Sequence, residues 1–223
     1  MKALIIIILC LISIISWSQT FQGLYKENSD FLNFSDDSVK FKFESNGGLI
    51  INELGEGNYR LIDEFLIIKA SDYKGLKSVV HKSFNKNDRF ELKILNKHGN
   101  PLPGATILFL DQSEKVIDGL ISDNLGQANY QFSTKIKKIK IVFIGYDTIE
   151  FECDQFNSFT IELIDDEIIE NQIVVFQVIN HDTKSLSLRL LSTNYRSDQN
   201  AKELKILLKK TRKYNYRIRN YKT

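Results

Sequence analysis

The sequence predicts a mostly β protein, with a small N-terminal β-meander, a β-sandwich after it and a short basic helix at the C-terminus. Between residues 88 and 168, seven short apolar segments are separated by Gly, Asn, Asp and Ser, a spacing typical of a β-sandwich. Nearer the N-terminus, Val39, Phe41 and Phe43 alternate with charged residues, which is the period of a strand with one buried face.

The first 18 residues have the pattern of a signal peptide. One Lys precedes an apolar run, and Ser16 and Ser18 provide small residues at positions −3 and −1 of a cleavage site. The run is shorter than the ~20 apolar residues of a membrane span. We therefore expect export with cleavage after Ser18, and an uncleaved membrane anchor is the alternative. Cys10 follows bulky residues inside the apolar run, which excludes a lipidation site.

Cleavage after Ser18 would remove Cys10 and leave Cys153 as the single cysteine. No internal disulfide is then available, so a hydrophobic core must stabilise the chain. Cys153 falls on the same alternating face as Ile149 and Phe151, which predicts a buried small hydrophobe rather than a reactive thiol.

A net charge of +2 conceals an asymmetry along the chain. Residues 201–223 contain nine Lys and Arg and one Glu, whereas residues 21–200 contain 20 Lys and Arg and 27 Asp and Glu. Leu204, Leu207 and Leu208 would share one face of a helix. This basic tail either folds back on the acidic body or binds outward to an anionic surface. The candidates for such a contact are Lys209, Lys210, Arg212, Lys213, Arg217 and Arg219.

Residues 19–87 are expected to form the first β unit. It contains a glycine-rich turn at 55–57 and a polar break between two strands at Asp63 and Glu64. The elements "GLY" (23–25) and "GNYRLIDEFLII" (57–68) resemble those of small lipocalin-like β domains of exported bacterial proteins.

Residues 88–168 contain an ordered series of motifs. These are "NKHGNPLPGATILFLDQ", "ISDNLGQANYQF", "IVFIGYDTIEFE" and "FTIELID". The series resembles the carboxypeptidase regulatory-like domain, with Ser122-Asp123 where Thr-Asp is commoner. The resemblance implies a transthyretin-like, seven-stranded Greek-key sandwich without catalytic activity. "NQIVVFQV" (171–178) also resembles a strand that follows this domain in outer-membrane proteins, and residues 169–200 are expected to form extra strands or a linker.

The motif residues are expected to have structural roles. Pro101 and Pro103 make a rigid extended connection, Asp123 can accept hydrogen bonds from the backbone of its own turn, and Gly145 needs a positive φ. The complete set is Gly99, Pro101, Pro103, Gly104, Ala105, Asp123, Gly126, Gly145 and Tyr146.

The sequence offers no catalytic, metal-binding or cofactor-binding constellation. His81, His98 and His181 are far apart and lack the spacing of zinc ligands. Neither a hydrolase nucleophile motif nor a phosphate-binding loop occurs. The acidic stretch 165–167 lacks the ligand series of a calcium loop and is interpreted as a solvated strand end.

These patterns lead to two functional hypotheses. The first is an exported, non-enzymatic cell-envelope binding or scaffold protein, accessory to an outer-membrane assembly, in the periplasm, at the outer membrane or secreted. Its partner would be an envelope protein, an anionic surface or a glycan, and not nucleic acid. The alternative is a carrier of a small apolar or glycan ligand in the first β unit. A lined cavity in that unit favours the carrier, and a filled core with an exposed apolar strand edge favours the interaction module.

Overall fold

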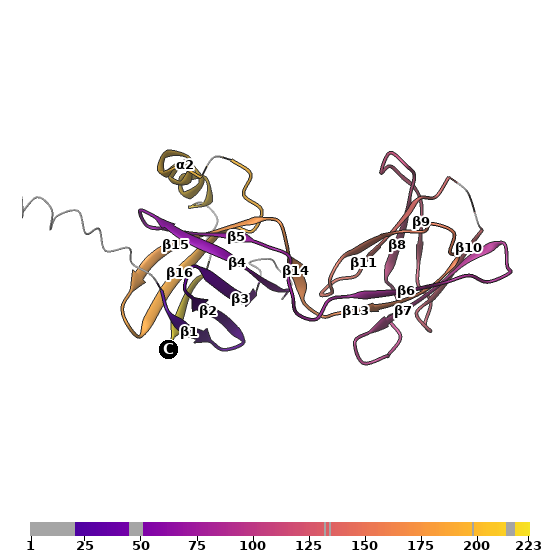
Figure 1. Cartoon of the computed structure of the whole chain (residues 1–223), viewed down its shortest axis with the longest axis horizontal. Helices are drawn as coiled ribbons and strands as arrows, with labels where there is room; N and C mark the ends of the chain where they lie inside the picture. Colours follow the sequence, from indigo (N-terminus) through magenta and orange to yellow (C-terminus); the bar gives the residue numbers. More distant parts are fainter. Residues whose placement is uncertain (1–20, 45–50, 132, 134, 198, 213–216) are drawn as a thin grey trace, which may run out of the picture.

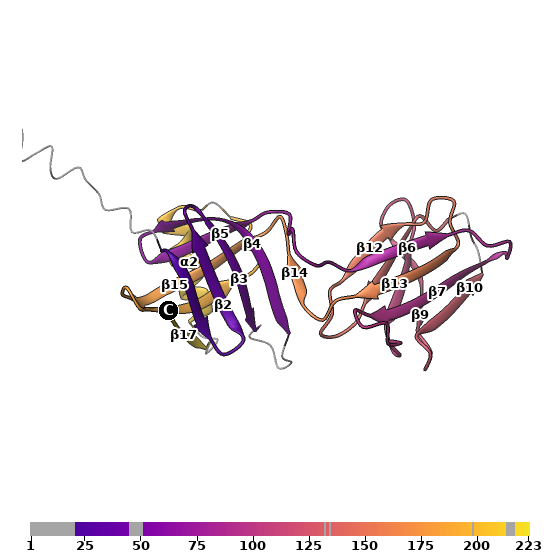
Figure 2. The ribbon, with the colours of Figure 1, turned by 60° about the horizontal axis from the view of Figure 1, so that its bottom comes forward.

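The computed structural model describes residues 21–223 except 45–50, 132, 134, 198 and 213–216. The chain forms two lobes joined by two stretches that run side by side (Figures 1 and 2). Residues 21–70 and 167–223 make the barrel lobe, and residues 79–163 make the sandwich lobe. The sandwich is therefore inserted into the barrel lobe. The predicted signal peptide (1–18) lies outside the described residues.

Eight antiparallel strands in chain order form a closed, barrel-like sheet in the barrel lobe. They are β1 (Gly23–Glu27), β2 (Asp30–Ser35), β3 (Ser38–Glu44), β4 (Asn52–Ile62), β5 (Phe65–Ala70), β15 (Ile173–His181), β16 (Ser185–Ser192) and β17 (Ile218–Lys222). Each strand pairs with the next, and the ring closes where Lys222 of β17 pairs with Lys26 of β1. A short strand, β14 (Glu167–Ile169), adds to β4 in parallel.

Side chains fill the interior of the barrel lobe. Phe41, Phe43, Leu66 and Phe176 are fully buried there together with residues from the other strands. The alternation predicted for Val39, Phe41 and Phe43 is confirmed. The predicted turn at 55–57 is wrong, because these residues lie inside β4. Gly55 makes room for the Phe41 ring, since a Cβ at Gly55 would lie 2.5 Å from Phe41 Cζ.

Helix α2 (Ala201–Thr211) covers the outer face of the closed sheet beside β5 and β15 (Figure 1). Its buried Leu204 and Leu208 pack against Phe65 and Ile67 of β5, whose other face points into the barrel. Because both faces of β5 are buried, this strand is a continuous apolar run rather than an alternating one. Within the described part of the chain, no helix is both long enough and apolar enough to cross a membrane.

The sandwich lobe contains two four-stranded sheets, in the orders β10-β7-β13-β6 and β12-β11-β8-β9. The strands are β6 (Val79–Ser83), β7 (Arg89–Asn96), β8 (Thr106–Leu110), β9 (Val116–Ile121), β10 (Gln127–Gln131), β11 (Lys138–Val142), β12 (Ile149–Glu152) and β13 (Ser158–Leu163). A separate apolar core lies between the sheets and includes Phe90, Phe109, Ile139 and Ile161.

All seven predicted sandwich strands form, but the predicted boundaries need correction. β6 lies within residues 19–87, yet it pairs with β13 and is an eighth strand of the sandwich lobe. The extra strands expected in residues 169–200 are β15 and β16, which complete the first β unit. Without these strands, β1 and β5 would each have an edge with unpaired backbone N–H and C=O groups. β15 pairs with the edge of β5, and β17 pairs with the edge of β1.

The basic tail contains the helix α2 and the strand β17, which corrects the prediction of a helical tail over 201–223. β17 pairs with β1 and β16, and its alternation turns Arg219 and Tyr221 toward the interior. Arg219 is 1% exposed, so its prediction as a surface contact is wrong. Its Nε donates to Asp30 Oδ2 at 3.1 Å, and its guanidinium also donates to the carbonyl of Glu44. Burial raises the pKa of Asp30, and the charge of Arg219 opposes that rise.

The other predicted contact residues of the tail differ in position. Lys209 and Lys210 are exposed in the last turn of α2, and Arg212 is exposed directly after it. Arg217 is about half exposed and lies 3.7 Å from carboxylates of Glu27 and Glu44. Lys213 lies outside the described residues. These cations therefore belong to a folded segment whose remaining charges face solvent.

We predict that Arg219→Ala lowers the free energy of unfolding by about 3–5 kcal/mol, because it leaves the Asp30 carboxylate buried without its cation. Arg217→Ala, which removes a neighbouring exposed cation, should change it by only about 0–1 kcal/mol. Urea unfolding at neutral pH measures both. Equal losses in the two variants would show that the buried pair does not support the barrel lobe.

Glu53 is a partly buried acidic residue of β4, opposite Phe43 of β3. It also pairs with Glu167 across β4 and β14. Its Oε2 atom is buried and accepts no hydrogen bond from a described residue. Burial, reinforced by the charge of Glu167 and opposed by that of Arg219, raises the pKa of Glu53 to about 7.

This raised pKa predicts that Glu53 destabilises the fold at alkaline pH. The folded state holds the proton more tightly, so the contribution to stability is complete below the unfolded pKa of about 4.5 and is lost as pH rises through about 7. Glu53→Gln should therefore be more stable than the natural protein by about 1–2 kcal/mol at pH 8 and equally stable at pH 4. Thermal unfolding at both pH values, with Glu152→Gln at an exposed position as control, tests this. A gain independent of pH contradicts it.

Candidate functional site

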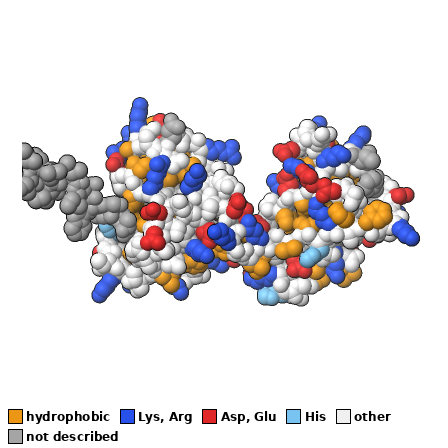
Figure 3. Space-filling view, in the orientation of Figure 1, with side chains coloured by type: hydrophobic (Ala, Val, Ile, Leu, Met, Phe, Trp, Pro, Cys, Tyr) orange, Lys and Arg blue, Asp and Glu red, His pale blue; other side chains and the backbone are white. Residues whose placement is uncertain are grey.

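Strand β9 is an exposed, apolar edge of the sandwich lobe. It ends one sheet, and β8 is its only partner among the strands that the structure describes. Val116, Ile117 and Ile121 are 48%, 41% and 69% exposed. Figure 3 shows hydrophobic side chains between acidic and basic ones on this lobe. An edge strand presents unpaired N–H and C=O groups, so an apolar one is a template for pairing with another chain.

The register of β9 determines which of its groups are free. Asp118 and Leu120 pair with Phe109 and Ile107, which are buried, so they share the inner face. Ser122 donates its backbone N–H to the carbonyl of Ala105 at 3.0 Å. Hydrogen-bonding residues alternate in an antiparallel pair. The backbone N–H and C=O groups of Gly119 and Ile121 therefore point away from β8.

The side chain of Asp118 accepts a hydrogen bond from one of these free backbone groups. Its Oδ1 accepts the backbone N–H of Gly119 at 2.8 Å, and its Oδ2 accepts the hydroxyl of Tyr130 at 2.6 Å. The hydrogen bond from Tyr130, and then that from Gly119, hold the pKa of Asp118 below its usual value. Tyr130 lies on β10, the edge of the other sheet, and stacks on Phe109 with ring centroids 4.3 Å apart. The carboxylate thus joins the two sheets and makes the β9 edge less available for pairing with another strand.

A β-bulge adds to this protection. The β8–β9 pairing shifts register between Phe109 and Leu110, leaving Ile117 as the additional residue of a bulge. Gly119 has no side chain, and a Cβ there would lie 3.2 Å from the carbonyl oxygen of Ile107 and 3.3 Å from Leu108 Cδ2. The space beside Gly119 is therefore already occupied by its neighbours on β8, and Leu108 and Ile121 provide the apolar contact on the outer face.

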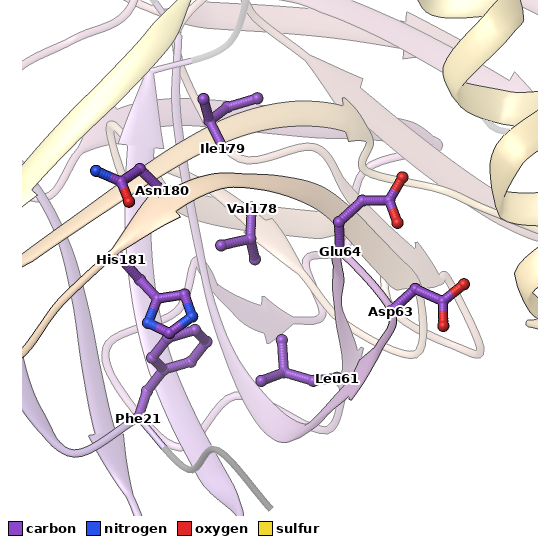
Figure 4. A pocket seen from close by; sticks show the side chains of 8 residues that line it. All are labelled: Phe21, Leu61, Asp63, Glu64, Val178, Ile179, Asn180 and His181. Atoms are coloured by element: carbon purple, nitrogen blue, oxygen red, sulfur yellow. The ribbon is translucent and has the colours of Figure 1, made fainter.

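A pocket of about 260 Å³ lies at one end of the barrel lobe. Its lining residues are Phe21, Leu61, Asp63, Glu64, Val178, Ile179, Asn180 and His181. Figure 4 shows Leu61 and Val178 pointing toward its centre, with His181 against Phe21 on one side and the two acidic residues on the other. Asp63 forms an ion pair with Lys205 of α2 at 3.1 Å. The pocket is a shallow apolar floor with a polar rim, outside the filled interior.

The residues of the predicted motifs gather in the turns at one end of the sandwich lobe. Ser122 links two of the motifs, because its hydroxyl donates to the carbonyl of Leu102 at 2.7 Å and accepts the N–H of Ala105 at 2.9 Å. Asp123 Oδ1 accepts the N–H groups of Leu125 and Gln127 at 2.9 and 2.8 Å. These contacts hold the loops together, which is the structural role predicted for the motif residues.

The motif glycines have the backbone conformations that turns require. Gly99, Gly104, Gly126 and Gly145 all have positive φ, and that of Gly145 is 80°. At Gly126 a Cβ would also lie 2.4 Å from the carbonyl oxygen of Ile94, so close approach of the backbone requires glycine there. Pro101 forms an isolated bridge with Leu95, consistent with an extended connection.

The remaining groups that could carry chemistry are dispersed or engaged. Among the residues that the structure describes, no three His, Cys, Asp or Glu side chains are grouped so as to hold a metal ion. Asp165 and Asp166 of the acidic stretch form ion pairs with Lys97 of the sandwich lobe and Lys42 of the barrel lobe, at 2.5 and 2.7 Å. Cys153 is buried, as predicted, and burial raises the pKa of its thiol to about 12.

Sequence reasoning identified β9 as a strand but missed its role as an edge. The signal was available in "VIDGLI", where Asp118 and Gly119 interrupt an otherwise apolar strand. Asp and Gly are depleted in strands, and an inward-pointing charge is a common device for protecting an edge. The contribution of Tyr130 could not be read from the sequence, because it lies on the opposite sheet.

No protein-family model matches this chain, and the comparisons with curated proteins and with solved structures found no match either.

Proposed function

We propose that this is an exported, non-enzymatic binding or scaffold protein of the cell envelope, in which the β9 edge pairs with an extended segment of a partner protein. The exposed apolar edge of β9 is the observation that carries the proposal. Backbone groups of Gly119 and Ile121 would supply hydrogen bonds to an added strand, and exposed isoleucines would supply apolar contact. The signal-peptide pattern and the motif series of residues 88–168 support export and a carboxypeptidase regulatory-like module.

The filled interior of the barrel lobe also favours an interaction module over a carrier. Leu32, Phe41, Leu188 and Phe176 occupy the space that a lipid-sized ligand would need, and each is 0% exposed. The barrel lobe would then serve as a rigid support for the sandwich lobe. The ion pairs of Asp165 and Asp166 to the two lobes fit this role, because they restrain the connection between them.

A direct test uses the mature protein immobilised and exposed to envelope extract. We expect a discrete partner to be retained by the natural protein and lost with Ile121→Lys, which places a charge on the β9 edge. Val79→Lys is the matched control, because Val79 is 42% exposed on β6, an edge strand of the other sheet. Mass spectrometry identifies the retained protein. Retention that is unaffected by Ile121→Lys, or lost equally in both variants, would overturn the proposed site.

The pocket at the end of the barrel lobe supports the carrier function as a second candidate, for a small ligand only. Its volume of about 260 Å³ and its floor of Leu61 and Val178 would hold a short apolar group. Leu61→Trp should fill the pocket and abolish the fluorescence of a bound apolar dye such as anilinonaphthalene sulfonate, whereas Ile121→Lys should leave it unchanged. Absence of saturable dye binding by the natural protein excludes this function.

A further inference from the structure

The protection of the β9 edge can be reversed by an incoming strand. Asp118 Oδ1 holds the N–H of Gly119, which is the group that a partner carbonyl would need. When the carbonyl takes this N–H, Oδ1 loses its donor while Oδ2 keeps the hydroxyl of Tyr130. A carboxylate that has lost a donor lies directly beside the added strand. It would be stabilised by a cation from that strand and would disfavour an acidic residue.

Alternation in the added strand determines which positions meet which chemistry. Residues that share the outer face with Gly119 and Ile121 would contact the side chains of Leu108 and Ile121. Residues that share the inner face with Asp118 would meet its carboxylate. Apolar and cationic side chains should therefore alternate along the partner strand.

The chain segment that contains β9 has a net negative charge. From Asp111 to Asp123 the chain contains four carboxylates and one lysine. Glu114 is paired with Lys138 at 2.7 Å, and Asp111 and Asp123 bind backbone N–H groups of their own turns. Lys138 therefore offsets the charge of Glu114, whereas Asp111 and Asp123, before and after β9, bind neutral groups and keep carboxylates that would attract a basic segment.

We propose that the β9 edge recognises an extended protein segment in which apolar residues alternate with Lys or Arg, and that Asp118 exchanges the N–H of Gly119 for a cation of that segment. This inference rests on the proposed function and specifies the chemistry of the partner. An acidic segment would meet repulsion from Asp118. A segment with its cations clustered at one end would lose the alternation.

The test uses three fluorescein-labelled peptides and the mature full-length protein. The first alternates Val with Lys and Arg, the second alternates Val with Glu and Asp, and the third has the composition of the first with all cations at one end. We expect saturable binding of the first peptide by fluorescence anisotropy, and weaker binding of the other two. Hydrogen exchange should show protection of the Gly119 amide only in the complex with the first peptide.

Two variants separate the contributions of charge and edge. Asp118→Asn removes the charge and keeps one oxygen, which can still accept the N–H of Gly119, while its amide NH2 can donate to the hydroxyl oxygen of Tyr130. It should weaken binding of the first peptide about 2–5-fold, the range of one cross-strand ion pair, and should not weaken binding of the acidic peptide. Ile121→Lys should abolish binding of the first peptide, and Val79→Lys should leave it unchanged. Circular dichroism verifies that each variant is folded.

The outcomes distinguish this inference from the proposed function. If an envelope protein is retained through Ile121 but the basic and acidic peptides bind equally, the proposed function stands and the alternating basic partner is wrong. If light scattering shows a dimer that Ile121→Lys dissociates, the occupant is a second copy of the chain and the inference is wrong. If neither peptides nor envelope protein protect the Gly119 amide, both proposals fail.

Discussion

Closure of the eight-stranded sheet by its last strand is the constraint on which the rest of the structure depends. The first five strands precede the sandwich lobe and the last three follow it. β5 and β15 are hydrogen-bonded neighbours, with Lys69 opposite Ile173. The chain must therefore leave and re-enter the barrel lobe at adjacent points. The hydrogen bond from Asn171 to Asp72, 3.1 Å long, ties the two connections together at that position.

The buried pair of Arg219 and Asp30 specifies how the closing strand is placed. Burying two charges costs desolvation energy, so the pair is a poor source of net stability. A shift of β17 by one residue would, however, turn Arg219 outward and leave Asp30 buried alone, since side chains alternate along a strand. The pair thus penalises other registers of β17. The ring of Phe43, 5.6 Å from the guanidinium carbon, provides a further contact in the observed register.

The sheet of the barrel lobe is closed, whereas the sheets of the sandwich lobe have open edges. The closed sheet pairs the edges of its eight strands with one another. The sandwich lobe keeps open sheets whose edges are joined by side chains. Where the edge strands β6 and β12 face each other, Lys82 donates to the carbonyl of Glu152 and to Asp154. Between the edge strands β9 and β10, Asp118 accepts the hydroxyl of Tyr130. Its other oxygen accepts the backbone N–H of Gly119, which a partner strand could use.

Local sequence determined the strands between residues 88 and 168, the alternation of Val39, Phe41 and Phe43, the helical start of the basic tail and the buried state of Cys153. Alternation and turn residues are local properties, and each strand predicted between residues 88 and 168 is present. Only the tertiary structure decided that residues 173–222 complete the first β unit and that Arg219 is buried, because strand pairing over such separations depends on which edges remain free. The candidate site was decided in the same way. The segment "VIDGLI" encodes a strand, but its exposure follows from its place at the end of a sheet, and the hydrogen bond of Asp118 to Tyr130 follows from the packing of one sheet on the other.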